Sequence, residues 1–298
     1  STQGYSSAAS DVYKRQAIMS PGEFCYFDSY QDAPDSQPEA IGGYLPLSKV
    51  YSFNPVPDTL SADKVQLVYG VQANLFTEYI PTPEHAEMMI YPRILALAEV
   101  AWSAPSVKNY DDFHVRALKE VEALKAEGYH PFELKNEIGN RPGADQPVQH
   151  LAVGKKVAYG PDAAYYPGYS AGGDSALVDG VIGGWTYGDR RWQGFIDKKR
   201  MDVTIDMEKE TEIHSVGADF MQVCGPEVFM PSEVIISVSN DGKEFTELKR
   251  MEHKVVKDDK VTFINFGWEG NAKARYIRYQ ASSGEFGGFL FTDEIVVK

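Results

Sequence analysis

The sequence is poor in the features that would place it at a membrane or around a metal or disulfide. It has two cysteines, Cys25 and Cys224. They fall in segments that we assign below to different domains, so we expect each to be a free, buried thiol. Their positions match no zinc or redox spacing. No run approaches the roughly 20 apolar residues of a membrane span. Residues 1–16 lack the apolar middle region of a signal peptide.

Basic residues are also scarce relative to acidic ones. The chain has 29 lysines and arginines against 43 aspartates and glutamates, and its formal net charge is -14. This charge repels phosphate backbones and anionic lipid surfaces at long range. We therefore expect neither a nucleic-acid partner nor membrane insertion, whereas neutral ligands such as sugars are compatible with the composition.

The length and polar segments predict two folded parts. A chain of 298 residues exceeds what one hydrophobic core usually serves. Residues 1–16 are small and polar without periodicity; we expect them to be disordered and, because they resemble translated adapter sequence, not native. Residues 135–150 are polar and contain proline and glycine, which predicts a linker. The linker separates residues 17–134 from residues 151–298.

The first part alternates strand and helix patterns. Apolar runs at Glu23–Asp28 and Gln66–Asn74 predict short buried strands that end in polar residues. Helices are expected around residues 47–53, 84–102 and 112–127, the second beginning at Thr82-Pro83 and kinked or restarted at Pro92. Its predicted buried face comprises Tyr91, Ile94, Leu95, Ala98 and Trp102. This order is typical of the end of a (β/α)₈ barrel; two strands cannot close a barrel, so we expect an incomplete domain.

The second part contains only strand patterns. Short runs of β-forming residues, separated by turn signals, predict an all-β sandwich. The runs are residues 202–206, 212–220, 233–239, 261–266, 275–281 and 293–297. Asn240-Asp241-Gly242 between two of these runs predicts a hairpin with a type I′ turn, since Asp-Gly readily takes positive φ angles.

Four ordered motifs give residues 18–132 a family resemblance. They are Tyr26-Phe27-Asp28 with Tyr30-Gln31, the run from Tyr51 to Pro57, the run from Gly70 to Glu78, and His85-Ala86-Glu87 through Tyr91-Pro92-Arg93 to Trp102. Together they resemble the last part of the family 20 glycoside hydrolases, the β-N-acetylhexosaminidases. The resemblance implies a mixed α/β and all-β chain whose first part is the last two βα units of a TIM barrel.

The resemblance also implies a reaction. In that family the substrate's 2-acetamido oxygen attacks the anomeric carbon while a glutamic acid, preceded by an orienting aspartate, protonates the leaving oxygen. Asp293-Glu294 is the sole Asp-Glu dipeptide in this sequence. It lies at the end of the sandwich, outside the family's His-x-Gly-Gly-Asp-Glu context. The general acid is therefore expected to be absent from this chain, which alone should be inactive.

Other pocket residues do match the family pattern. Tyr26 matches the tyrosine that hydrogen-bonds the acetamido oxygen and holds it near the anomeric carbon; the alternative is an ordinary buried tyrosine. Asp28 and Glu78 match carboxylates that accept hydrogen bonds from sugar hydroxyls; the alternative is solvated charge at strand ends. Phe76 stands where the family usually has the tryptophan under the sugar ring, and so lacks the indole N–H donor.

Three further residues of the first part receive weaker assignments. Tyr44 could border the leaving-group side of the pocket, or be a plain surface aromatic. His85 and Trp102 are assigned to packing.

Residues 151–298 resemble the factor V/VIII type C, or discoidin, fold. The resemblance rests on Leu151 to Lys155, Ala176 to Gly180, Arg191 to Phe195, Val238 to Gly242, Ala274 to Arg278 and Phe291 to Ile295. Many relatives hold a structural calcium ion, whose ligands here would be Asp179 and Glu294. No cofactor is expected for catalysis. Four aromatic residues are candidates for sugar stacking or for packing: Trp185, Tyr187, Trp192 and Trp268.

Two functions are compatible with the sequence. The first is a fragment of an exo-β-N-acetylhexosaminidase that removes terminal N-acetylglucosamine or N-acetylgalactosamine from glycans and requires the missing N-terminal part of the barrel. The alternative is a non-catalytic carbohydrate-binding or interaction module carried by the sandwich. By resemblance, the intact protein would be bacterial and exported to the periplasm or cell surface.

Overall fold

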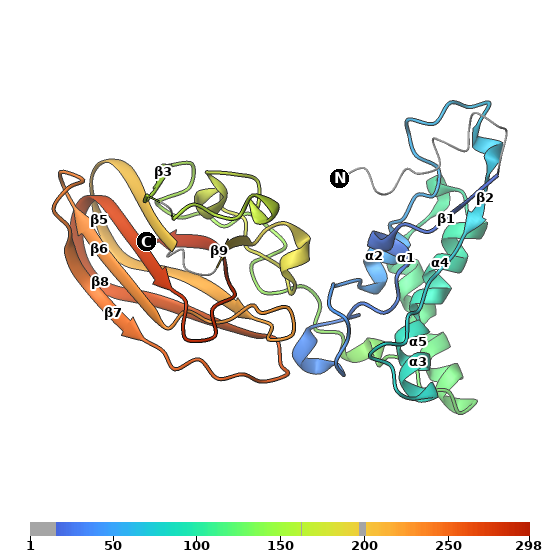
Figure 1. The fold of residues 1–298 in the computed structure, drawn as a ribbon. Coiled ribbons are helices and arrows are strands. Elements are labelled where there is room, and N and C mark those ends of the chain that lie inside the picture. Colours follow the sequence, from blue (N-terminus) through green and yellow to red (C-terminus); the bar gives the residue numbers. More distant parts are fainter. Residues whose placement is uncertain (1–15, 162, 197–200) are drawn as a thin grey trace. The chain divides into compact units, whose positions relative to one another are not determined.

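The computed structural model describes residues 16–161, 163–196 and 201–298, which form two units (Figure 1). The units are Ser1–Gly139 and Asn140–Lys298, so their boundary falls within the segment predicted as a linker. Disorder was expected for residues 1–16; of these, residues 1–15 lie outside the described part of the chain. The two units are described separately.

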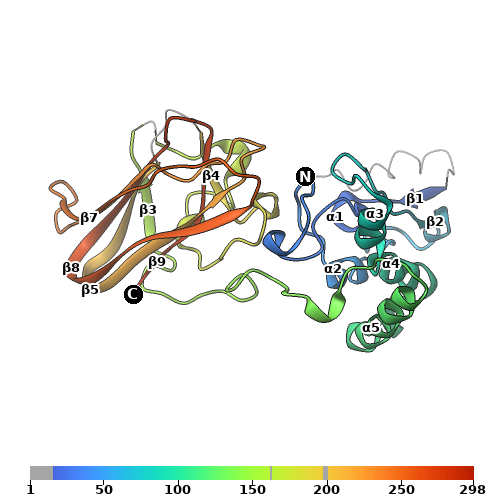
Figure 2. The same cartoon turned by 90° about the horizontal axis from the view of Figure 1, so that it is seen from below.

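The first unit combines a small parallel sheet with helices. Strands β1 (Ala17–Met19) and β2 (Val68–Val71) pair in parallel. The helices are α1 (Gly22–Cys25), α2 (Leu47–Tyr51), α3 (Pro83–Ile90), α4 (Arg93–Trp102) and α5 (Tyr110–Ala126), with 3₁₀ turns at Pro34–Ser36, Val65–Leu67, Pro105–Val107 and Leu134–Asn136. Figure 2 shows α4 and α5 from a second direction. Throughout the described residues, every helix is too short or too polar to span a membrane.

The first predicted strand is wrong over much of its length. Residues 22–25 form the single helical turn α1, in which the N–H groups of Phe24 and Cys25 donate to the Pro21 carbonyl at 3.0 and 2.9 Å. An unbroken apolar run cannot distinguish a buried strand from a buried helical turn by its periodicity. The extended backbone begins only at Tyr26, and the second strand is shorter than predicted, β2 covering Val68–Val71.

The helical region begins as predicted but buries a different face. Thr82 caps α3 by accepting the His85 N–H at 3.2 Å, and the helix restarts after Pro92. The buried residues of α4 are Arg93, Ala96, Leu97 and Val100. Trp102, predicted to pack, is 90% exposed. The predicted buried face was counted with one helical period across Pro92. Because a new helix begins at Arg93, different residues of that helix point into the core.

Helix α5 follows its sequence signals more closely. Asn109 caps its start by accepting the Asp112 N–H at 3.2 Å. Gly128, directly after the C-cap residue Glu127, has a positive φ of 92° of the kind that commonly ends a helix. Phe113, Ala117 and Val121 form its buried face.

The second unit is the predicted β-sandwich. Its strands run in the order β4-β9-β5-β8-β6-β7, with β3 pairing to β5, and every described pairing is antiparallel. Their bounds are β3 Lys156–Tyr159, β4 Gln193–Ile196, β5 Met201–Gln222, β6 Glu233–Ser239, β7 Thr246–Glu252, β8 Thr262–Ser282 and β9 Phe289–Val297, and 3₁₀ turns lie at Pro167–Tyr169, Ala176–Val178 and Tyr187–Asp189. The long strands β5 and β8 each unite two strands predicted separately, because irregular register between Asp206 and Thr211 bends β5 without ending it.

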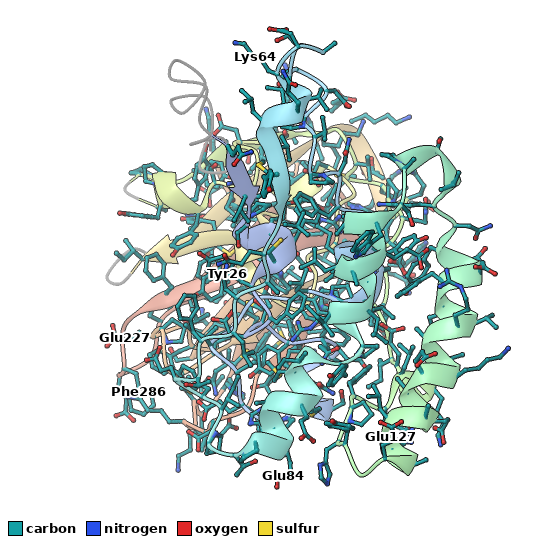
Figure 3. All side chains as sticks on the ribbon, turned by 90° about the vertical axis from the view of Figure 1, so that its right-hand side faces the viewer. Tyr26, Lys64, Glu84, Glu127, Glu227 and Phe286 are labelled. Carbon is teal, nitrogen blue, oxygen red and sulfur yellow. The ribbon has the colours of Figure 1, made fainter. Side chains whose placement is uncertain are left out.

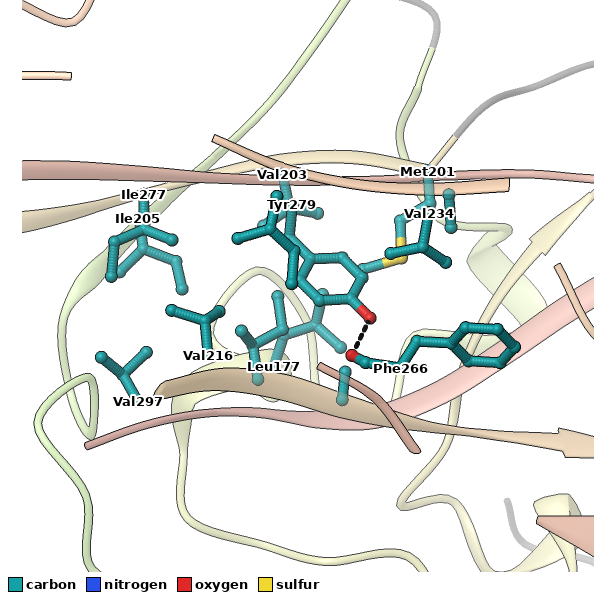
Figure 4. Packing of buried hydrophobic residues seen from close by; sticks show 14 of the residues in the cluster. Leu177, Met201, Val203, Ile205, Val216, Val234, Phe266, Ile277, Tyr279 and Val297 are labelled. Atoms are coloured by element: carbon teal, nitrogen blue, oxygen red, sulfur yellow. Dashed lines mark hydrogen bonds between the residues drawn. The ribbon is translucent and has the colours of Figure 1, made fainter. Parts of the chain in front are cut away.

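The sandwich core lies between its strands and is almost wholly apolar (Figure 4). Its largest polar member, Tyr279, is fully buried, and its hydroxyl donates to the Phe266 carbonyl at 2.8 Å. This bond removes the cost of burying the hydroxyl. Both cysteines are free, Cys25 being buried and Cys224 half-buried.

The hairpin after β6 does not have the predicted turn. Residues 240–245 separate β6 from β7. Gly242 has a positive φ of 71°, but Asp241 does not, so the turn is not type I′. Instead the Asp241 carboxylate accepts the N–H groups of Lys243 and Glu244 at 2.8 and 2.9 Å. Side-chain capping of the loop replaces the second left-handed residue.

Polar contacts hold both sides of the unit boundary. In the first unit, buried Asp32 accepts the N–H groups of Ile138 and Gly139 at 2.7 and 2.9 Å. In the second, Arg141 is buried and its guanidinium donates to Asp293 and to the Gly183 carbonyl at 2.8 and 2.7 Å. Each unit therefore fixes the chain close to the boundary.

Candidate functional site

Two extended segments of the first unit bring Tyr26 and Phe76 together. Tyr26 and Asn74 form a parallel bridge. The Phe27 N–H donates to the Asn74 carbonyl at 2.7 Å, and the Asn74 N–H donates to the Cys25 carbonyl at 2.8 Å. The segments continue in the same direction, so the rings of Tyr26 and Phe76 lie 5.6 Å apart at 45°. Figure 3 labels Tyr26 at the end of α1. Phe76 is 56% exposed, which leaves apolar area for a ligand.

Tyr44 lies beside the other end of the first segment. It forms a parallel bridge with Tyr30, and the Leu45 N–H donates to the Tyr30 carbonyl at 2.8 Å. The loop of residues 31–43 thus returns the chain alongside residues 26–30. Tyr44 is half-buried and has interactions of its own.

The two carboxylates of the site differ in environment. Asp28 is 7% exposed, and its Oδ1 is buried with no hydrogen-bond partner among the described residues. Burial raises the pKa of this carboxyl; a backbone hydrogen bond and the positive charge of Arg93 partly oppose that shift. Glu78 is exposed. Asp28 is therefore an acceptor already withdrawn from water, whereas Glu78 is solvated.

Arg93 organises the backbone around Asp28, a role that the sequence reasoning missed. Its side chain is fully buried. The guanidinium donates to the carbonyls of Ser29 and Leu45 at 2.9 and 3.1 Å, and also to those of Phe27 and Met89. Burial lowers its pKa to about 9, and nearby Asp28 acts in the opposite direction. The signal that could have revealed it is a charged residue directly after Pro92, at the start of a helix in which Glu99 is the one other charged residue.

The predicted metal ligands of the second unit lie together. Glu294 Oε1 contacts His150 Nε2 at 2.7 Å and accepts the Gly180 N–H at 2.8 Å. Its Oε2 is buried without a partner among the described residues. Burial raises the pKa of Asp179 and of Glu294; the Val181 N–H opposes the shift of Asp179, and the contact with His150 opposes that of Glu294. Within the described part of the chain, no three histidine, cysteine or acidic residues cluster to hold a metal ion.

The candidate stacking aromatics of the sandwich are engaged in packing. Trp192 is buried, and its Nε1 donates to the Gly184 carbonyl at 3.1 Å. Tyr187 stacks on Phe291 at 4.9 Å, and Trp185 meets Phe263 edge-on at 5.7 Å. Trp268 packs against the main core but remains half-buried. Trp192 is therefore not available to a ligand, and the other three rings are available only in part.

Comparisons with known proteins agree with this division into two units. Residues 3–105 match the family described as glycosyl hydrolase family 20, catalytic domain, and residues 162–295 match the F5/8 type C domain. Part of the first match, residues 3–15, lies outside the described structure.

Two curated relatives match the first unit. A beta-hexosaminidase of Porphyromonas gingivalis is 48% identical over 97 residues, covering 32% of this chain and 12% of the relative. A beta-N-acetylhexosaminidase of Cellulomonas fimi is 33% identical over 104 residues, covering 35% and 21%. The chain thus spans at most about a fifth of either relative.

Among solved structures, a chitosan-binding module of a Paenibacillus chitosanase/glucanase is 16% identical with a TM-score of 0.35, covering 51% of this chain and 99% of the module. That likeness is too low to support a functional argument. The two family matches carry the assignment: the chain joins part of a glycosyl hydrolase family 20 catalytic domain to an F5/8 type C domain.

Proposed function

We propose that the intact protein is an exo-acting β-N-acetylhexosaminidase and that residues 17–134 are the C-terminal part of its barrel, forming one wall of the sugar pocket. The observation that carries this proposal is Asp28, whose Oδ1 is buried without a partner among the described residues. Asp28 follows Tyr26 by two residues, and the Tyr26 ring packs against Phe76. An unpaired buried acceptor is costly unless a ligand satisfies it. A sugar hydroxyl is the donor that such a site would receive.

In the proposed reaction the substrate supplies the nucleophile. Its 2-acetamido oxygen attacks the anomeric carbon, and the leaving oxygen takes a proton from an acid outside this chain. This attack forms a bicyclic intermediate. Water then opens the intermediate, and the configuration at the anomeric carbon is retained. The Tyr26 hydroxyl, which has no partner among the described residues, would donate to the acetamido oxygen and restrict its motion. Phe76 would support the apolar face of the ring, while Asp28 and Glu78 would accept hydroxyl protons.

Substituting Asp28 tests this assignment. In the proposed intact protein, we expect Asp28→Asn to lower kcat/KM about 10- to 100-fold on a nitrophenyl N-acetylglucosaminide, the value of a charged hydrogen bond. Asp35→Asn, in the exposed 3₁₀ turn at Pro34–Ser36, is the matched control and should leave kcat/KM unchanged. Equal kcat/KM values for the two variants would show that Asp28 does not contact the substrate.

The sandwich is proposed to hold a structural calcium ion at Asp179 and Glu294. The buried Glu294, whose Oε2 has no partner among the described residues, and the exposed Asp179 supply oxygen donors that fit a hard cation, whose charge would offset the desolvation of Glu294. The ion would join the loop at Asp179 to β9. The ion has no role in the proposed chemistry.

Two further proposals rest on the family resemblance alone: the sugar substrates, and export of the intact protein to the periplasm or cell surface.

Thermal unfolding tests for the ion. At a calcium concentration 100 times Kd, binding to the folded state alone should stabilise the sandwich by about 2.7 kcal/mol, seen as a higher Tm than with a chelator. Glu294→Gln should remove this difference, whereas Glu252→Gln, at an exposed end of β7, should retain it. If the unsubstituted protein unfolds identically with calcium and with chelator, the proposed calcium site is wrong.

A further inference from the structure

A buried carboxylate and a buried guanidinium lie in the same part of the first unit. Asp28 is 7% exposed, and the Arg93 side chain is fully buried. Burying a charged group costs free energy unless hydrogen bonds or another charge compensate it. The way in which these two charges are compensated therefore decides the state of Asp28, the acceptor that the proposed function assigns to a sugar hydroxyl.

The hydrogen bonds of Arg93 all go to uncharged groups. Its Nε and one terminal nitrogen donate to the Met89 carbonyl at 3.1 and 2.7 Å, and the same terminal nitrogen donates to the Phe27 carbonyl. The other terminal nitrogen donates to the carbonyls of Ser29 and Leu45 at 2.9 and 3.1 Å. An arginine has five N–H groups, so these five bonds use all of them. No bonded carboxylate neutralises the positive charge, which acts on its surroundings through space.

Two of these carbonyls flank Asp28 in the chain. They belong to Phe27 and Ser29, and the guanidinium also lies over the Phe27 ring, 5.0 Å from its centroid. Contacts before and after Asp28 fix the backbone that carries its carboxylate. Burial raises the pKa of Asp28, while the charge of Arg93 lowers it. Away from water this attraction is stronger than at the surface, so it favours the ionised carboxylate.

The other charged groups on the neighbouring elements do not replace Arg93. Lys49 of α2 is partly exposed and pairs with Glu23 at 2.7 Å. Burial lowers the pKa of His85 in α3, which favours its uncharged form. The nearby acidic side chains are exposed or bonded to other groups: Asp32, Glu78, Glu84, Glu87 and Glu99. Among the described residues, Arg93 is thus the cation that acts on Asp28.

We propose that Arg93 is a positioning residue of the sugar pocket, which fixes the backbone at Asp28 and keeps the Asp28 carboxylate ionised as an acceptor for a sugar hydroxyl. This inference rests on the proposed function and adds the group that sets the charge of the acceptor. A protonated carboxyl group presents a donor in place of part of its acceptor capacity. Arg93 would therefore set how far into the acid range the pocket binds its substrate.

Two substitutions of Arg93 separate its charge from its hydrogen bonds. Both Arg93→Gln and Arg93→Lys lose most of the bonds to the carbonyls, but only Arg93→Lys keeps a positive charge. Arg116→Gln, which removes a half-exposed surface cation, is the control. In the full chain, labelled with ¹³C at the aspartate carboxyl groups, the signal of Asp28 is assigned from its loss in Asp28→Asn and is followed as the pH is changed.

We expect Asp28 to be ionised at neutral pH in the unsubstituted chain. Its titration should move to higher pH in Arg93→Gln, because the charge that lowers the pKa of Asp28 is gone, and should stay close to the unsubstituted midpoint in Arg93→Lys and Arg116→Gln. In the proposed intact protein, the acid limb of the kcat/KM profile should move in the same direction. At mildly acidic pH, Arg93→Gln should fall about tenfold or more below Arg93→Lys, the value of a charged hydrogen bond.

The proposal is overturned if Asp28 is protonated at neutral pH in the unsubstituted chain, a result that needs no variant to fold. It is also overturned if Arg93→Gln and Arg93→Lys titrate alike, because Arg93 would then act only by holding the backbone. Failure of the proposed function gives a different result: the unsubstituted intact protein would show no turnover, whereas the NMR titration would still decide whether Arg93 sets the charge of Asp28.

Discussion

Replacing Arg93 with alanine is expected to destabilise the first unit by about 3–5 kcal/mol. The side chain is fully buried, and its guanidinium donates to four backbone carbonyls, those of Phe27, Ser29, Leu45 and Met89. Its removal leaves these acceptors without partners and Asp28 without its nearest described positive charge. Because typical domains are stable by about 5–15 kcal/mol, this loss is a large fraction of the total.

Urea unfolding of the whole chain, followed by tyrosine and tryptophan fluorescence, measures this effect. Arg116→Ala is the control, because Arg116 is 49% exposed and pairs with Glu99 and Asp112 at 2.8 and 2.9 Å on the surface; such pairs contribute about 0–1 kcal/mol. Arg93→Lys should recover little of the lost stability, since one ammonium group cannot reach all the carbonyls that surround the planar guanidinium. Equal midpoints for the Arg93 and Arg116 variants would show that the buried hydrogen bonds contribute little.

The second large effect concerns catalysis by the chain alone. We expect no detectable release of nitrophenol from nitrophenyl N-acetylglucosaminide. The Asp293-Glu294 dipeptide cannot replace the family's acid, because Asp293 is paired with Arg141 at 2.8 Å and Glu294 contacts His150 at 2.7 Å inside the sandwich. Loss of a general acid costs about 10² to 10⁴ in rate, before the rest of the pocket is considered.

A steady-state assay at matched protein concentration decides this, with the Porphyromonas gingivalis beta-hexosaminidase as the positive control. Asp293→Asn in the full chain should leave the baseline unchanged, because we assign that residue to the sandwich. Turnover within tenfold of the positive control would mean that an acid within this chain serves the reaction.

The sequence predicted the sandwich better than the first unit. Strand β6 was predicted at its observed bounds, Glu233–Ser239, because alternating β-branched residues bounded by turn signals have one interpretation. The bend that unites residues 202–206 with 212–220 in β5 could not be predicted, since register between distant strands decides whether a strand ends or bulges.

In the first unit, long-range contacts decided the outcome. The apolar run at residues 23–28 begins as the helical turn α1 because Pro21 accepts two N–H groups, which a strand pattern does not reveal. The contact between Tyr26 and Phe76 depends on a parallel bridge between residues distant in sequence; family motifs, not periodicity, pointed to both residues. The buried structural roles of Arg93 and Arg141 were not predicted because charged residues are rarely buried.

The central claim is that Asp28, Tyr26 and Phe76 bind an N-acetylated sugar. It is tested most directly by measuring kcat/KM for nitrophenyl N-acetylglucosaminide in the proposed intact protein, before and after Asp28→Asn. Our account predicts clear turnover that falls about 10- to 100-fold on substitution. Turnover that the substitution leaves intact, or a longer protein with none, would contradict it.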